Sequence, residues 1–143
     1  MKADPKTEAA VMNVVKKWFE AFAKRDIYGV MRFLAPDPDV VVIGTGGDEK
    51  CIGLAEIKAV SERFFSQFED ASFGIGWHSV SAVGSVAWVA ADIVFNVRAG
   101  RQEISMPLRE TAVLEKRGDR WLVVQSHDSL PAAGQKEGQA FPT

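Results

Sequence analysis

One stretch near the C-terminal end, "RETAVLEKRGDRWLVVQSHDSLP" at residues 109–131, holds the side chains best suited to chemistry. It contains Arg109, Glu110, His127 and Asp128, and His127 is one of only two histidines in the chain. A carboxylate beside a histidine can exchange a proton near neutral pH, because histidine titrates in that range. Such a pair inside a cavity is what general acid–base chemistry requires.

The strands that carry these side chains determine which of them meet. A two-residue turn at 118–119 predicts a hairpin in which Glu110 faces His127. On the opposite side of the same hairpin, Arg109 faces Asp128. That second pair is expected to be an outward ion pair, which contributes less than about 1 kcal/mol when exposed.

A turn at 99–100 fixes the register of the preceding hairpin, and this register agrees with the first on which residues share a face of the sheet. One face is almost wholly apolar and is therefore expected to face the core; its apolar members are Ala87, Val89, Ala91, Ile93, Phe95, Ile104, Met106, Leu108, Ala112, Leu114, Trp121 and Val123. Three adjacent polar residues interrupt it, namely Glu110, Gln125 and His127. A carboxylate in such a place is costly unless it is paired. We expect Glu110 to act as acid or base, His127 to tune or relay its proton, and Gln125 to orient a substrate. The alternative is a buried, hydrogen-bonded pair without a substrate.

The opposite face of the sheet is mixed, with more apolar area than a solvated face needs. The residues that we expect to form a homodimer interface there are Trp88, Val94, Arg109, Val113 and Val124. Asp92 lies on the same predicted face and is interpreted as an outer-face or interface residue. The side on which His78 lies depends on the turn near Gly84.

The rest of the chain predicts helices first and a long sheet afterwards. Apolar residues recur at helical spacing over 4–26, where Asp4 can cap the helix, and Asp26 can cap a second, short helix. The other predicted elements are strands at 40–44 and 51–53, a helix at 54–68, and a four-strand antiparallel meander at 71–83, 85–98, 101–116 and 120–130. The fold class is therefore α+β, with three N-terminal helices packed on a strongly curved antiparallel sheet. Such a sheet over aromatic helices tends to leave a cavity between them.

Aromatic side chains are the expected walls of that cavity. The side chains expected to bind a ligand, together with Gln125, are Trp18, Phe22, Phe64, Phe68, Met106 and Trp121. Core packing alone is the alternative role for them. "GTGGDEK" lacks phosphate-binding spacing and is interpreted as a turn, and its Asp48 and Glu49 are interpreted as solvated charges rather than as the rim of the cavity.

No cofactor or metal is expected, because two histidines and one cysteine have no zinc-like spacing. Ser126, His127 and Asp128 cannot form a triad as consecutive strand residues, since neighbours on a strand point to opposite faces.

Composition narrows the class of protein. A formal charge of -2 without a clustered basic face argues against nucleic-acid binding, and no apolar run is long enough to span a membrane. "MKADPKTEAA" lacks the apolar segment of a secretory signal, and the lone Cys51 fits a reducing compartment, so a cytoplasmic location is expected. We expect one domain at 1–131 and a small polar tail at 132–143.

The run from about residue 8 to residue 131 resembles the SnoaL-like domains of the nuclear-transport-factor-2-like superfamily. The matching stretches are "WFEAFAKRDIYGVMRFLAPDPDVVVIGTGGDEKCIGLAEIKAVSERFF" and "RETAVLEKRGDRWLVVQSHDSLP". The resemblance implies a cone of curved sheet wrapped on three helices, a pocket in the cone, and a dimer packed sheet to sheet. The second stretch also looks like the association domain of calcium/calmodulin-dependent protein kinase II. Ile93 and Ala112 stand where that domain has pocket arginines, so this chain lacks that anion-binding feature.

Members of this superfamily differ in function, so the fold does not give the reaction. We expect a small, largely apolar organic ligand in the cone and cofactor-independent isomerisation, dehydration or cyclisation of it. The alternative functions are a non-catalytic dimerisation or ligand-sensing module and a purely structural domain with a vestigial pocket.

Overall fold

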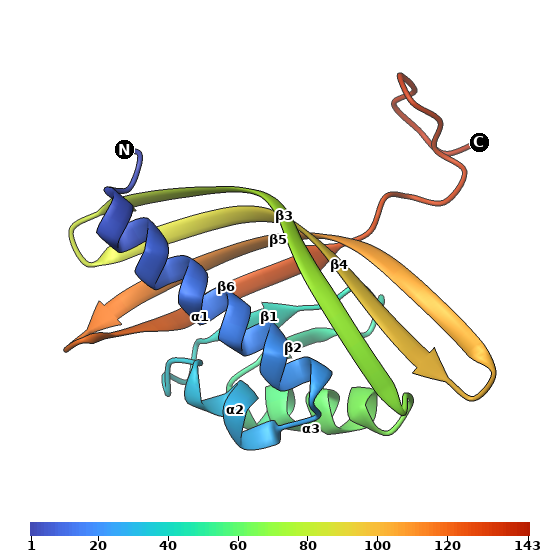
Figure 1. Cartoon of the computed structure of the whole chain (residues 1–143), viewed down its shortest axis with the longest axis horizontal. Helices are drawn as coiled ribbons and strands as arrows, with labels where there is room; N and C mark the ends of the chain where they lie inside the picture. Colours follow the sequence, from blue (N-terminus) through green and yellow to red (C-terminus); the bar gives the residue numbers. More distant parts are fainter.

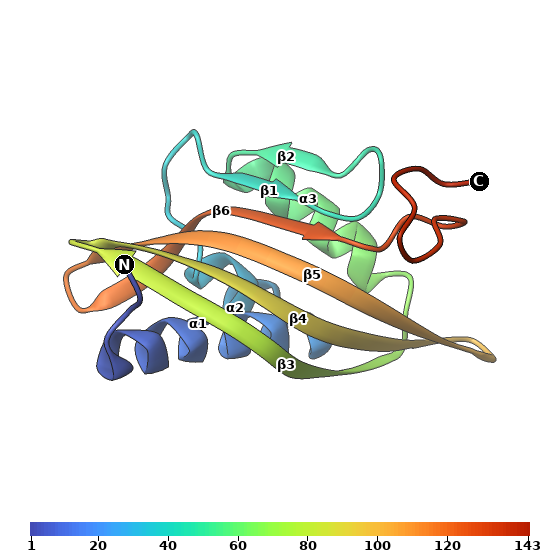
Figure 2. The same ribbon diagram turned by 90° about the horizontal axis from the view of Figure 1, so that it is seen from above.

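The computed structural model describes all of residues 1–143 and confirms the predicted α+β fold. Three helices pack against one mixed sheet with the strand order β2-β1-β6-β5-β4-β3. Figure 1 shows α1 lying across the long strands, with α2 and α3 below it. Figure 2 shows the four long strands twisting along their length. The sheet is not closed, because β2 and β3 form its two edges.

The helices begin where the sequence predicts. α1 (Pro5–Ala23) is capped by Asp4, whose carboxylate accepts a hydrogen bond from the Thr7 backbone at 2.8 Å. α2 (Ile27–Arg32) is capped in the same way by Asp26. α3 (Leu54–Phe65) ends three residues before the predicted Phe68. None of the three helices combines the length and apolar character that crossing a bilayer would require.

The strands follow the predicted order, with one pairing that the sequence did not indicate. β1 (Val41–Ile43) and β2 (Lys50–Ile52) form a short hairpin, and β1 also pairs in parallel with the last strand, β6 (Arg120–Ser129). The meander is completed by β3 (Asp70–Val83), β4 (Val86–Ala99) and β5 (Gln102–Arg117). The predicted four-strand antiparallel meander is confirmed, and the parallel pair makes the whole sheet mixed. The residues after Ser129 form no helix or strand and extend away from the sheet (Figure 1).

The turn between β4 and β5 lies one residue later than predicted. Ala99 pairs with Gln102, so the turn consists of Gly100 and Arg101, and the φ of 63° at Gly100 lies in the left-handed region that glycine adopts readily. Each pairing is therefore shifted by two residues, and Glu110 faces Ala91 rather than Val89. A shift of two residues leaves every side chain on its predicted face.

The hairpin between β5 and β6 contains a β-bulge that reverses the predicted faces of its second half. Leu114 pairs with Val123 as predicted, but Val113 pairs with Gln125, so Val124 is an extra residue without a partner. Beyond the bulge, every β6 side chain lies on the face opposite to the predicted one. Glu110 faces Asp128, and the predicted pairs Glu110–His127 and Arg109–Asp128 are both wrong.

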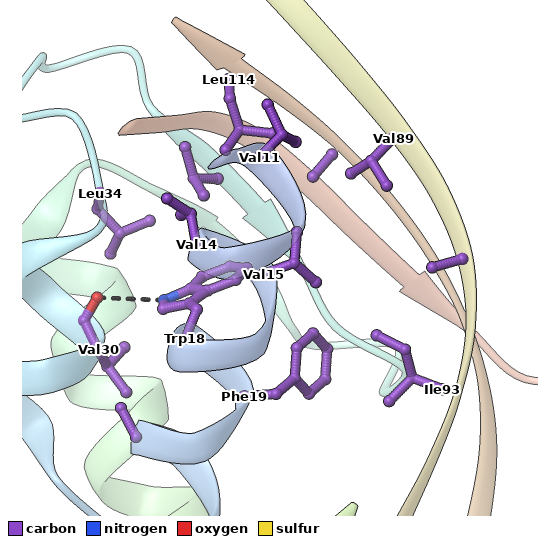
Figure 3. Packing of buried hydrophobic residues seen from close by; sticks show 14 of the residues in the cluster. Val11, Val14, Val15, Trp18, Phe19, Val30, Leu34, Val89, Ile93 and Leu114 are labelled. Carbon is purple, nitrogen blue, oxygen red and sulfur yellow. Dashed lines mark hydrogen bonds between the residues drawn. The ribbon is translucent and has the colours of Figure 1, made fainter. Parts of the chain in front are cut away.

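The core fills the space between the helices and the concave side of the sheet. Val11, Val15 and Trp18 of α1 are at most 2% exposed and pack toward inner-face residues such as Ile93 and Leu114 (Figure 3). Ile104 was expected on this inner face but is 44% exposed near the end of its hairpin. The helices and the sheet thus enclose an apolar interior in which any polar group requires an explanation.

Candidate functional site

A cavity of about 130 Å³ lies between the helices and the C-terminal half of β6. Its walls come from the second half of α1, from α3, from the β1–β2 hairpin and from the inner face of the long strands. Four of the predicted wall residues line it, namely Trp18, Phe22, Phe64 and Met106. The apolar lining also includes Phe19, Val42, Ile57, Val60, Phe95 and Leu108. Because Thr45 both lines the cavity and is exposed, the cavity reaches the surface beside the β1–β2 turn.

Two predicted wall residues lie elsewhere in the core. Phe68 is buried behind Phe64, with 4.9 Å between the ring centroids, and does not reach the cavity. Trp121 is buried at the opposite end of β6, seven residues from Asp128, which corresponds to about 23 Å along a strand. Facing the core was therefore not sufficient to place a side chain at the cavity.

The remaining lining of the cavity is polar, and it includes Glu49 and Asp128. Glu49 accepts a hydrogen bond from the Gly46 backbone at 3.0 Å, and its carboxylate lies so close to Gly44 that a side chain there would collide with it. The preceding Asp48 points to α3, where it forms an ion pair with Arg63 at 3.1 Å. The prediction of solvated turn charges fits Asp48 but is wrong for Glu49.

Glu110, which is buried, and Asp128, which is half-buried, form a pair of carboxyl groups at the cavity. Glu110 is 1% exposed and accepts one hydrogen bond at 3.2 Å, from the hydroxyl of the equally buried Ser126. Oε2 of Glu110 and Oδ1 of Asp128 are buried and receive no hydrogen bond from any N–H or O–H group. Asp128 lines the cavity, whereas Glu110 lies beside it on the neighbouring strand. If both carboxyl groups were ionised, neither could donate a hydrogen bond to the other. A hydrogen bond between them therefore requires that one of them is protonated.

The surroundings of the pair determine where that proton resides. Burial raises the pKa of Glu110 well above its ordinary value of 4.5, the hydrogen bond with Asp128 and its charge raise it further, and the Ser126 hydroxyl opposes them. Burial also raises the pKa of Asp128, whereas the hydrogen bond with Glu110 and the charge of His127 lower it. Because two adjacent carboxyl groups cannot both ionise freely, these shifts favour one retained proton on the pair, and the deeper burial of Glu110 favours that residue as its holder.

Both histidines lie away from this pair. His127 and Gln125 are exposed on the outer face, where they border a shallow groove of about 320 Å³ together with Trp77 and Trp88. His78 pairs with Ala91 and lies on the helix side, where it contacts Glu8 at 3.5 Å. The predicted roles of His127 and Gln125 in the cone are therefore not supported by their positions.

Besides the apolar lining named above, the side chains that the sequence did not single out for the cavity include Thr45, Cys51, Ser61 and Asp128. Cys51 is 3% exposed between the exposed Lys50 and Ile52, an alternation that a strand prediction could have used. Asp128 reaches the cavity only because Val124 is a bulge residue. The run of four apolar residues at 121–124 does not show which of them is extra. No group of three or more histidine, cysteine or acidic residues is arranged to hold a metal ion.

Residues 11–133 match the family model of the SnoaL-like domain, so the chain belongs to that family, as the sequence resemblance predicted. No protein of curated function matches the chain in sequence.

Three solved structures show how widely this fold is shared. A nuclear transport factor 2-like superfamily protein from Salmonella enterica serovar Typhimurium superposes with a TM-score of 0.80 and 18% identity, covering 95% of this chain and 96% of that one. A protein from Novosphingobium aromaticivorans, provisionally assigned as a scytalone dehydratase, has a TM-score of 0.79 and 12% identity over 88% of this chain and 85% of its own. A Xanthomonas campestris protein, provisionally assigned as a calcium/calmodulin-dependent protein kinase II association domain, has a TM-score of 0.76 and 22% identity, covering 92% and 90%. The chain therefore has the nuclear-transport-factor-2-like fold, and at these identities the likeness extends to the fold alone.

Proposed function

We propose that the chain binds a small, largely apolar organic molecule in the cavity and exchanges a proton with it through Asp128, without a cofactor. One observation carries the proposal. Two carboxyl groups, each with a buried oxygen that lacks a partner, meet at the end of a cavity whose walls are otherwise mostly apolar. Burying two carboxyl groups with a single hydroxyl donor beside them is costly even when they share a proton, and arrangements of this kind are concentrated at functional sites.

In this proposal the two carboxyl groups have different tasks. Asp128 faces the cavity and is the group that takes a proton from the ligand or returns one to it. Glu110 lies behind it and holds the proton of the pair, which keeps the Asp128 carboxylate hydrogen-bonded on one oxygen and leaves the other for the ligand. Glu110 thereby tunes the basicity of Asp128, a task that the sequence had led us to expect of His127.

Proton exchange of this kind supports a short list of reactions. A base that removes a proton from one carbon and returns it to another isomerises the ligand. If the proton goes instead to a hydroxyl group on the neighbouring carbon, water leaves and the ligand is dehydrated. If the deprotonated carbon instead attacks a carbonyl carbon of the same ligand, a ring closes and the carbonyl oxygen receives the proton back from Asp128. The fold of a provisionally assigned dehydratase agrees with this list, although the carboxyl pair is what supports it here.

Native mass spectrometry of the purified chain tests the binding step. We expect an adduct that denaturation releases, with a mass suited to a cavity near the size of one that holds a single benzene molecule, about 150 Å³. The released compound is then incubated with the protein in heavy water, where wild type should incorporate deuterium or form product. Asp128→Asn should bind the compound and leave it unchanged.

Asp92→Asn is the matched control, because it removes the same charge from the exposed outer face of the same sheet. It should retain both binding and exchange. The proposal is refuted if no adduct forms and NMR shows that benzyl alcohol, as a probe of the cavity, does not perturb the resonances of Trp18 and Phe64. Unchanged exchange in Asp128→Asn would refute the assigned role of Asp128 while retaining the binding function.

The outer face of the sheet supports a second candidate function, dimerisation of the module without catalysis. Trp77 is 61% exposed and Val94 is 43% exposed, and Trp88 and Val113 border the groove beside them. Exposed large apolar side chains gathered on one face are typical of a protein interface. Sedimentation velocity of the wild-type chain tests this function, which requires a dimer at micromolar concentration. The two functions are compatible, because the cavity and the groove lie on opposite faces.

A further inference from the structure

The cavity is lined by acidic side chains and by no basic one. Of its lining residues only Glu49 and Asp128 carry a formal charge, and both are carboxylates. The thiol of Cys51 adds no further negative charge, because burial and the surrounding acidic groups raise its pKa. An apolar cavity with this lining has a negative potential toward its polar end.

The charged groups around the cavity do not neutralise this potential. Glu110, on β5, contributes a proton to the carboxyl pair but no net positive charge. Arg63, on α3, is paired with Asp48. His127, next to Asp128 in the chain, is exposed on the other side of the sheet. With one proton on the pair, one negative charge remains, and no lysine, arginine or histidine forms an ion pair with Glu110 or Asp128.

The walls of the cavity also favour a positive charge. Trp18, Phe22 and Phe64 contribute aromatic rings to the lining, and Phe64 packs near Phe95 at 6.0 Å between ring centroids. Aromatic faces attract cations within about 6 Å, and the attraction is larger where water is excluded. The aromatic part of the cavity therefore suits an apolar group, and its rings add an attraction for a cation bound to the carboxylates at the polar end.

Resting on the proposed function, we propose that the ligand of this cavity is a small hydrophobic ammonium compound. It is a primary or secondary amine, protonated at neutral pH, with one apolar group about the size of a phenyl ring. The apolar group occupies the aromatic part of the cavity, and the ammonium group faces Asp128 and Glu49. Molecules of the same shape that carry a carboxylate or a phosphate are rejected by like charge.

Three probes of nearly equal size separate charge from shape, namely benzylammonium, benzyl alcohol and benzoate. Their dissociation constants are measured at neutral pH by NMR titration of the full chain. We expect wild type to bind benzylammonium at least tenfold more tightly than benzyl alcohol, and benzoate at least tenfold more weakly than the alcohol. Asp128→Asn should bring the amine to within about threefold of the alcohol, and the control Asp92→Asn should behave as wild type.

Glu49→Gln provides a second test that leaves the carboxyl pair intact, and it should reduce the preference for the amine without abolishing it. If the alcohol binds wild type as tightly as the amine, or if benzoate does, the inference about ligand charge is wrong while the proposed binding function survives. If none of the three probes binds, the proposed function is wrong and the inference falls with it. An amine preference that persists in both Asp128→Asn and Glu49→Gln would also overturn the inference.

Discussion

Replacing Glu110 with glutamine tests the protonation of the buried pair through the stability of the protein. The amide has nearly the shape of a protonated carboxyl group, can accept from Ser126 and can donate to Asp128. The substitution therefore preserves the packing and removes the titration. We expect Glu110→Gln to be at least as stable as wild type at neutral pH, although the residue that it replaces is 1% exposed.

The dependence on pH follows from the raised pKa of Glu110. In the unfolded chain this group loses its proton near its ordinary value of 4.5, whereas in the folded protein burial delays the loss. Its stabilising contribution is complete below about pH 4.5 and is lost as the pH rises toward and through the folded-state pKa. Over that interval one extra proton is bound in the folded state, which corresponds to about 1.4 kcal/mol of stability lost per pH unit. Glu110→Gln lacks this loss.

The measurement is urea unfolding followed by tryptophan fluorescence, at several pH values between about 5 and 8. The unfolding free energy of the variant minus that of wild type should rise by about 1.4 kcal/mol per pH unit. The difference becomes constant above the folded-state pKa of Glu110, which this plateau would determine. Glu103→Gln, an exposed position on the same strand, should show no such slope. Parallel curves for wild type and Glu110→Gln would refute the assignment of the proton to Glu110.

Three further predictions concern a hydrogen bond in the core, the cap of α2 and the outer face of the sheet. Trp18→Phe leaves the backbone carbonyl of Val30 without its 3.1 Å hydrogen bond (Figure 3) and should cost about 1–3 kcal/mol of unfolding free energy in urea titrations. Asp26→Ala removes the cap of a six-residue helix and should cost about 1 kcal/mol in the same assay. Val94→Arg places a charge on the outer face and should convert a wild-type dimer into a folded monomer, as judged by sedimentation velocity and circular dichroism. A monomeric wild-type chain would contradict that last expectation.

The helices and strands could be predicted because their signals are local. The apolar spacing from Val11 to Phe22 fits only one face of a helix, and Asp4 and Asp26 are followed by backbone N–H groups that they cap. The parallel contact of β1 with β6 could not be predicted in the same way. It joins Val41 to Gln125 across most of the chain, and no pattern within either strand specifies the partner.

The sequence predicted four of the cavity walls and only one of the two carboxyl groups. Glu110 was placed correctly because an error of two residues in a turn preserves the face of a side chain. Its partner was misassigned because a single extra residue reverses the face, and the sequence favours neither of the two faces for residues 125–128. Both registers place one acidic or basic group next to Glu110, namely Asp128 or His127. The position of the extra residue, at Val124, therefore decides whether Asp128 or His127 lies beside Glu110.

Deleting Val124 tests this dependence directly. A one-residue deletion within a regular strand moves every later side chain to the opposite face. Val124 has no partner, so its removal would let Val123 and Gln125 continue a regular ladder with the present pairing, and Asp128 would stay opposite Glu110. We expect this variant to fold and to bind benzylammonium, with some loss of affinity because the local bend that the bulge provides is gone. Deleting Ala112, which is paired and 4% exposed, should instead destroy binding. If the two deletions abolish binding equally while both variants remain folded by circular dichroism, Val124 is not the residue that sets which side chains of β6 face the cavity.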